Sequence, residues 1–141
     1  MSKWTDKFPK SEITGKITNT TVEFAMEFGS HLGTDSYTER NNKNVVDISK
    51  LTTSQLRKFF GEVKRQQMNG YNETDFVLLK PKLAYAVGRS KGRSKITDFY
   101  DVMSLAIDLV KSETNFKNFI KFFEAIVAYH KAAEEKKNIN N

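Results

Sequence analysis

Residues 52–70, TTSQLRKFFGEVKRQQMNG, carry the pattern that decides the fold. Thr52 and Gln55 fit a capping box, in which a hydroxyl and an amide satisfy opposed backbone N–H groups at the start of a helix. Asn69-Gly70 is a good C-terminal stop. The pattern therefore predicts an amphipathic helix over residues 52–69, with one apolar stripe at i, i+3, i+4 and i+7: Leu56, Phe59, Phe60 and Val63.

A second helix is expected to begin at Asn72 or Thr74 and to run to about Arg89. Pro81 lies inside this pattern, where its ring removes one backbone hydrogen bond and restricts the residue before it. We therefore expect this helix to bend after Leu78 or to split there.

Two more helices follow, one over residues 97–112 and one that begins with Asn115 as its cap and frays over Glu134–Asn141. His130 lies beside the apolar stripe of the last helix, and we expect a core histidine without an acidic partner at helical spacing. Four amphipathic helices joined by short turns predict an all-α fold, a compact antiparallel helical bundle. Its predicted core includes six residues: Leu56, Phe60, Leu83, Val87, Phe119 and Phe123.

The first 47 residues form a less regular N-terminal arm, rich in Thr, Asn, Ser and Lys. Thr20–Leu32 can form a short helix with Val22 and Met26 on its apolar side, whereas the Thr and Ile residues of Lys10–Thr21 can equally favour an extended chain. Asn41–Asn44 reads as an irregular joint. We expect residues 1–47 to be this arm and residues 48–141 to be the helical bundle domain.

Composition excludes several classes of site. A chain of 141 residues without cysteine has no disulfide, no Cys-ligated metal and no thiol nucleophile, and two histidines leave little for a His-built site. Carboxylate pairs such as Asp98/Asp101 read as exposed helix patterns, and the sequence contains neither a Glu-x-x-His motif nor a Gly-rich phosphate loop. We therefore expect a non-enzyme that needs no metal or other cofactor. The short apolar runs and the polar N-terminus predict a cytoplasmic protein without a membrane partner.

The net charge is concentrated in one segment. The chain has 23 Lys+Arg and 17 Asp+Glu, a net charge of +6, and Arg57–Lys95 alone holds ten basic and three acidic residues, a net charge of +7. A single lysine usually belongs to a solvated helix face. A segment this unbalanced favours a polyanion-binding surface.

The candidate nucleic-acid-binding surface combines the first predicted helix, the second predicted helix and the basic turn that follows. Lys82, Tyr85 and Arg89 share one face at i, i+3 and i+7. Tyr85 either stacks on a sugar or base or packs between helices, and Gly61 is expected to let another backbone approach. Without a base-reading motif, contacts should go to the nucleic-acid backbone regardless of sequence. The candidates are Arg57, Lys58, Lys64, Arg65, Lys82, Tyr85, Arg89, Lys91 and Arg93.

Three blocks, Leu51–Phe60, Leu83–Arg89 and Phe119–Lys131, resemble in order and spacing the small helical subunit of the type III-A CRISPR–Cas effector, the Csm complex. The resemblance implies a compact helical protein without catalytic activity, of which several copies stack head-to-tail. It implies partners in the crRNA-bound backbone subunits, the large polymerase-like subunit, crRNA and target RNA. It also implies contacts of basic residues with the RNA backbone, which carry over onto Arg57 and Arg89 in the matching blocks and further onto Lys58, Lys64, Arg65 and Lys82. It implies that RNA cleavage and cyclic-oligonucleotide synthesis belong to other subunits.

Two alternatives stay open beside this reading. One is a free-standing helical adaptor whose basic face binds an acidic protein. The other is a small enzyme with an unrecognised site. The salt dependence of RNA affinity separates the first alternative from an RNA-contacting subunit, because release of counterions from phosphates gives a steep slope.

Overall fold

A computed structural model describes residues 3–140, with side chains through Lys136. The described chain is mostly helical, as expected, and adds a two-stranded antiparallel sheet that the all-α prediction did not include. None of its helices is long and apolar enough to cross a membrane. The elements in order are α1 (Lys3–Lys7), α2 (Lys10–Thr14), α3 (Asn19–Leu32), β1 (Ser36–Arg40), β2 (Lys43–Ile48), α4 (Thr53–Asn69), α5 (Glu73–Val77), α6 (Leu79–Ser90), α7 (Ile96–Leu109) and α8 (Glu113–Asn140).

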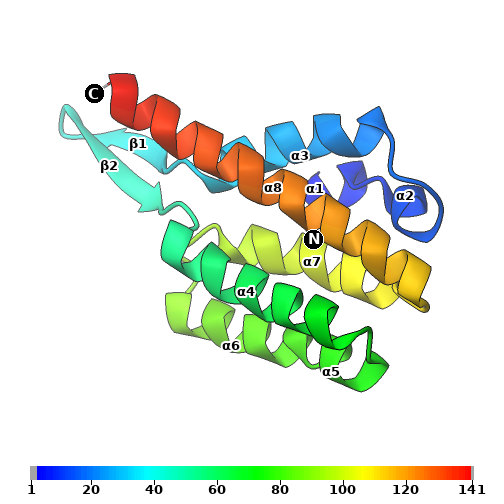
Figure 1. Ribbon diagram of the computed structural model, residues 1–141. Helices are drawn as coiled ribbons and strands as arrows, with labels where there is room; N and C mark the ends of the chain where they lie inside the picture. Colours follow the sequence, from blue (N-terminus) through cyan, green and yellow to red (C-terminus); the bar gives the residue numbers. More distant parts are fainter. Residues whose placement is uncertain (1–2, 141) are drawn as a thin grey trace.

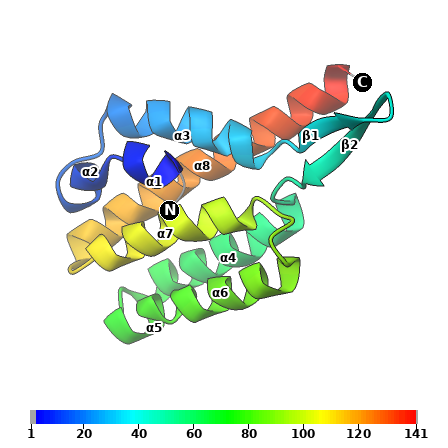
Figure 2. The same ribbon diagram turned by 180° about the vertical axis from the view of Figure 1, so that it is seen from behind.

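The helices lie in three tiers (Figure 1). Helices α7 and α8 form the middle tier, α3 with the short α1 and α2 covers one side, and α4, α5 and α6 cover the other (Figure 2). Helix α4 packs on α8 whereas α6 packs on α7. The hairpin β1–β2 extends from one end of the molecule, beside the C-terminal part of α8.

Helix α4 begins with the predicted capping box. The Thr52 hydroxyl accepts a hydrogen bond from the Gln55 backbone N–H at 3.1 Å, and the Gln55 side chain accepts one from the Thr52 N–H at 3.0 Å. The helix ends before Gly70, as predicted. A Cβ at Gly61 would meet nothing within 4 Å, so the backbone approach expected there is wrong.

The second predicted helix splits at Leu78, as expected. Helix α5 ends at Val77 and α6 begins at Leu79. Pro81 is the third residue of α6, in the first turn, where the N–H that proline lacks has no partner within the helix. The break thus follows directly from the position of the proline.

Most of the predicted core is buried, and the two exceptions lie at its edge. Leu56, Leu83, Phe119 and Phe123 are buried. Phe60 and Val87 are only partly buried, although the Phe60 ring still meets the edge of the Phe123 ring, with centroids 5.2 Å apart. The apolar stripe of α4 therefore continues past the core boundary.

Helix α8 differs from its prediction at its start and in its buried surface. It begins at Glu113, because the Ser112 hydroxyl, rather than Asn115, caps it by accepting from the Asn115 N–H at 3.2 Å. Phe122, outside the predicted stripe, is buried against Phe8, with ring centroids 5.1 Å apart. The helix is therefore buried on two sides.

The junction between α8 and the start of α4 is held by His130 and Glu134. His130 is buried, as predicted, and its Nε2–H donates to the Leu51 carbonyl at 2.6 Å. The expectation that it lacks an acidic partner is wrong, since Nδ1 lies 3.4 Å from Glu134 Oε1, four residues along the helix. Glu134 also accepts from Lys50 at 2.9 Å and from the Thr53 hydroxyl. The expectation that the helix frays from Glu134 onward is wrong for Glu134 itself, because its side chain is held by these contacts. The side chains from residue 137 onward lie outside the described residues.

The N-terminal arm is more regular than expected. Lys10–Thr14 is helical rather than extended. The helix expected at residues 20–32 is confirmed as α3, but it buries Phe24 and Phe28 and leaves Val22 and Met26 exposed. At Gly29 a Cβ would lie only 2.8 Å from the Tyr129 Cβ, so glycine permits the close contact of α3 with α8.

The segment expected as an irregular joint is the turn of the hairpin. Asn41 and Asn42 form a two-residue loop between the paired residues Arg40 and Lys43. Both have positive φ, of 53° and 63°, the combination that a type I′ hairpin turn requires and that asparagine tolerates. Buried residues before and after this hairpin belong to one hydrophobic core. The division of the chain into an arm, residues 1–47, and a bundle domain, residues 48–141, stays a prediction.

Candidate nucleic-acid interface

The basic residues of α4 lie on two sides of the helix rather than on one arc. Lys58 and Arg65 lie seven residues apart on the side that faces α6. Lys64 is turned toward α8, where its Nζ lies 3.8 Å from Glu124 Oε1, and Arg57 shares its helical position one heptad earlier. The structure therefore brings Lys58 and Arg65, but not Arg57 and Lys64, toward the basic side of α6.

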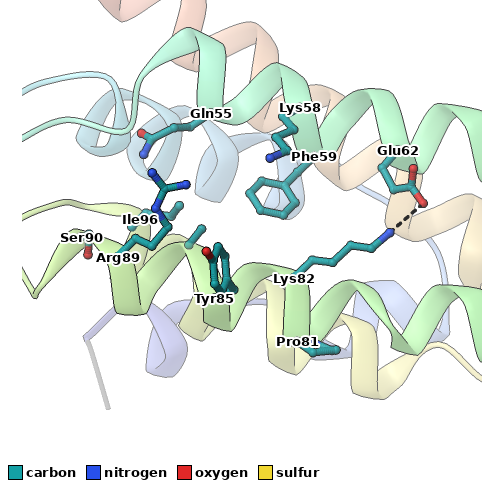
Figure 3. A pocket seen from close by; sticks show the side chains of 11 residues that line it. Gln55, Lys58, Phe59, Glu62, Pro81, Lys82, Tyr85, Arg89, Ser90 and Ile96 are labelled. Carbon is teal, nitrogen blue, oxygen red and sulfur yellow. Dashed lines mark hydrogen bonds and ion pairs between the residues drawn. The ribbon is translucent and has the colours of Figure 1, made fainter.

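An open groove of about 840 Å³ runs between α4 and α6 (Figure 3). It exists because α4 rests on α8 while α6 rests on α7. Along its length, Gln55 lies opposite Arg89 toward one end and Glu62 lies opposite Lys82 toward the other (Figure 3). Lys58 lies between Gln55 and Glu62 on the α4 side, beside Phe59. Its lining residues are Gln55, Lys58, Phe59, Glu62, Pro81, Lys82, Tyr85, Ala86, Arg89, Ser90 and Ile96.

Tyr85 stands at the rim of this groove with 70% of its surface exposed. Such exposure excludes the alternative in which Tyr85 packs between helices. The Arg89 guanidinium carbon lies 5.9 Å from the centre of the tyrosine ring, within the range of a cation–π contact. The ring and the guanidinium are thus held together on one accessible edge.

Glu62 places a carboxylate inside the basic face. Arg65 Nη2 lies 2.7 Å from Glu62 Oε1, Lys82 Nζ lies 3.3 Å from the same oxygen, and the Gln66 amide adds a contact at 3.4 Å. The hydrogen bonds of Arg65 lower the pKa of Glu62 most strongly, burial opposes this, and Lys82 and Gln66 lower it further, to about 2. Sequence reasoning missed this residue, although its spacing of i+4 from Lys58 and i−3 from Arg65 is the spacing of helical ion pairs.

The basic turn after α6 is fixed by the chain that leaves the hairpin. Lys91 and Gly92 have positive φ, of 54° and 74°, which reverses the chain at the end of α6. The Ser49 N–H donates to the Arg93 carbonyl at 2.8 Å, and the Lys95 N–H donates to the Ser49 carbonyl at 2.8 Å. The Lys91 and Arg93 side chains remain exposed. The turn is therefore an ordered extension of the basic surface beyond the groove.

Two other basic residues of the segment do not join this surface. Lys95 is buried, with 4% of its surface exposed, and its Nζ donates to the His31 carbonyl in the last turn of α3 at 2.9 Å. Burial lowers the pKa of Lys95, against the opposing charges of Asp98 and Asp35. Lys80 pairs with Asp108 at 2.7 Å.

Five of the eight basic candidates form no ion pair within residues 3–136. The remaining candidates comprise Lys64, Arg65 and Lys82, each paired with a glutamate, and the aromatic Tyr85. The cations available to a polyanion are Arg57, Lys58, Arg89, Lys91 and Arg93.

A histidine–carboxylate pair lies apart from this surface, between α3 and α7. His31 Nε2 is 2.7 Å from Asp98 Oδ2, and the His31 ring lies against Trp4, with centroids 4.9 Å apart. Asp98 and Asp101 are both half-buried, which corrects the expectation of an exposed pair. Burial raises the pKa of Asp101, and the Asp98 charge raises it further. Within the described chain, no three His, Cys, Asp or Glu residues are grouped so as to hold a metal ion.

Comparison with known proteins identifies one family. The family described as Csm2 Type III-A matches residues 21–136, a range that includes the three resembling blocks, α4, α6 and the basic turn. Neither the comparison with curated proteins nor the comparison with solved structures gives a match. Because the family match covers most of the chain, this protein belongs to the Csm2 family, the small subunits of the type III-A CRISPR Csm complex.

Proposed function

We propose that this chain is a non-catalytic subunit of a type III-A effector that contacts the crRNA–target RNA assembly through the α4–α6 groove and the turn after α6. The observation that carries the proposal is the gathering of Lys58, Arg89 and Tyr85 on one open rim, continued by Lys91 and Arg93. Unpaired cations lose no internal partner when they neutralise a phosphate, and arginine can hold two phosphate oxygens at once.

Membership of a family of structural small subunits supports the absence of catalysis. Several copies then stack beside the crRNA-bound backbone subunits and below the large polymerase-like subunit, within the cytoplasm. RNA contact in such a filament is distributed over copies, so each copy needs only weak contacts that do not depend on sequence.

The test is a reconstituted Csm complex that carries Lys58→Glu with Arg89→Glu. Both side chains are exposed, so the variant should remain folded and helical. The matched control is Lys10→Glu with Lys16→Glu, which makes the same change in charge in α2 and in the loop just after it, on the opposite side of the molecule. Target-RNA affinity should fall several-fold in the groove variant only. The slope of log affinity against log salt should flatten by about one unit or less for each contact removed.

Two other results would contradict the proposal. If the groove variant drops out of the complex while RNA affinity per assembled complex is unchanged, the groove is a protein–protein surface, as the adaptor alternative states. If both variants lower RNA affinity equally, the groove has no special role and only net charge matters.

A further inference from the structure

The floor of the α4–α6 groove is apolar, which contact with phosphates alone does not explain. Phe59 of α4, with 8% of its surface exposed, and the half-buried Ala86 of α6 form this floor, and the fully buried Ile96 at the start of α7 lies beneath them. Phosphate contacts need cations at a surface and gain nothing from an apolar floor. The flat face of a nucleobase is the part of a nucleic acid that such a floor can accept.

Tyr85 and Arg89 offer the two interactions that bind a nucleotide, stacking for its base and a positive charge for its phosphate. The exposed Tyr85 ring offers a stacking surface, and within residues 3–136 it packs against no other aromatic ring. The guanidinium of Arg89 lies beside that ring, and the Lys58 side chain reaches the same stretch from α4 (Figure 3). Base stacking and phosphate neutralisation therefore coincide at the same place in the groove.

Glu62 makes the two ends of the groove electrostatically different. Its carboxylate closes the far end and holds Lys82 there at 3.3 Å (Figure 3). A phosphate approaching Glu62 must compete with its carboxylate for Arg65 and Lys82, whereas one approaching Arg89 and Lys58 meets two cations without an ion pair. The phosphate of a bound nucleotide therefore belongs at the Arg89 end, with its base toward Tyr85 and the floor.

Resting on the proposed function, we infer that this groove receives one unpaired nucleotide of a single-stranded RNA. The base stacks on Tyr85 over the apolar floor, and Arg89 with Lys58 holds the adjoining phosphate. The volume of about 840 Å³ lies within the roughly 300–1,000 Å³ typical of pockets for small molecules. Base-paired RNA cannot present this face, because its bases are stacked within the helix.

The test compares two RNA probes of equal charge on the purified full chain. One is a twelve-nucleotide oligouridine, and the other is the ribose-phosphate backbone of the same length without bases. Fluorescence anisotropy at fixed salt should show the oligouridine binding about tenfold more tightly, since stacking one base on an aromatic ring is typically worth that factor or more. A duplex of the same length should lack this advantage.

Four variants assign the difference in affinity to individual residues. Tyr85→Ala should reduce oligouridine affinity to that of the abasic probe, and Tyr85→Phe should retain the difference. Tyr37→Ala is the matched control, since Tyr37 is also exposed but lies on the hairpin outside the groove. Arg89→Gln should lower the affinity for both probes by the same factor.

The outcomes separate this inference from the proposed function. If the wild-type chain binds both probes equally while Arg89→Gln weakens both, the groove contacts the backbone alone, and the nucleotide inference is overturned. If Tyr85→Ala leaves the oligouridine preference intact, the inference is also overturned. If neither probe binds, or if Arg89→Gln changes nothing, both proposals fail.

Discussion

The side chains of Glu62 and Arg65 form a two-point ion pair one turn apart on α4, with Arg65 Nη2 2.7 Å from Oε1 and Nε 3.1 Å from Oε2. Lys82 reaches the same carboxylate from α6. One acidic residue therefore occupies two cations of the surface proposed to meet RNA, and a phosphate must compete with it for both.

Replacing Glu62 by Gln should raise RNA affinity several-fold, because the change releases Arg65 and Lys82 to neutralise phosphates. The slope of log affinity against log salt should steepen by up to about one unit per cation released. Asp108→Asn is the control, since it removes the same charge from a residue that pairs with Lys80 outside the groove. An equal gain in both variants would show that net charge alone sets the affinity.

The lowered pKa of Glu62 predicts that the free energy of unfolding depends on pH. Its pKa in the folded chain is about 2, below the ordinary value of about 4.3 for glutamate in an unfolded chain. A lowered folded-state pKa stabilises the fold above pH 4.3, and the contribution is lost as the pH falls toward 2. The difference in unfolding free energy between wild type and Glu62→Gln should therefore shrink over this range in denaturant titrations. If the difference in unfolding free energy between wild type and Glu62→Gln does not change with pH, the ion pair does not stabilise the fold in the way stated.

Replacing Lys95 and replacing Lys58 should have opposite effects, although both lysines belong to the basic segment Arg57–Lys95. Lys95→Ala removes a buried stem and the donor to the His31 carbonyl, so it should destabilise the fold by about 1–3 kcal/mol and leave RNA affinity unchanged. Lys58→Ala should change stability by about 0.5 kcal/mol or less and weaken RNA binding. Thermal unfolding and RNA titration of the two variants check both statements. A loss of RNA affinity in folded Lys95→Ala would place that side chain at the interface.

Phe123→Ala should destabilise the chain by about 3–5 kcal/mol, because the side chain is buried among Phe60, Phe99 and Phe119. Met68→Ala is the control, since Met68 is 87% exposed and its loss should cost about 0.5 kcal/mol or less. Equilibrium unfolding in urea measures both. A cost below about 1 kcal/mol for Phe123→Ala would mean that the face of α8 has been assigned wrongly.

Features that depend on neighbouring residues were predictable from the sequence. The start of α4 follows from Thr52 and Gln55, three residues apart, and the break at Leu78 follows from Pro81. These signals act over one helical turn, so no knowledge of the tertiary fold is needed to read them.

Features that depend on distant segments were not predictable in the same way. The hairpin has few buried residues, so its strands lack the alternation of apolar and polar residues that indicates a half-buried strand. Asn41 and Asn42 were the one local signal of its turn. Phe122 lay outside the apolar stripe because α8 packs on both sides, and a single stripe describes only one.

The site stays a prediction, and the structure shows only how the charges of the predicted segment are arranged. Summing charges along Arg57–Lys95 indicates a basic surface, yet the sum does not show which cations are already paired. Lys95 turned inward to α3, and Glu62 faced Lys82 across the groove, since α4 and α6 lie side by side. Both outcomes require the three-dimensional arrangement.

The packing of α3 on α8 has a consequence for biosynthesis. Helix α3 (Asn19–Leu32) contacts α8 (Glu113–Asn140), so α3 cannot complete its packing until α8, about one hundred positions later, has been synthesised. Before α8 is made, Phe24 and Phe28 can contact Trp4 of α1, but Phe24 lacks the Phe122 ring of α8, whose centroid lies 6.0 Å away in the folded chain. Contacts this far apart in sequence slow folding and leave apolar surface exposed on the nascent chain. The packing of α3 is therefore completed only once α8 has been made.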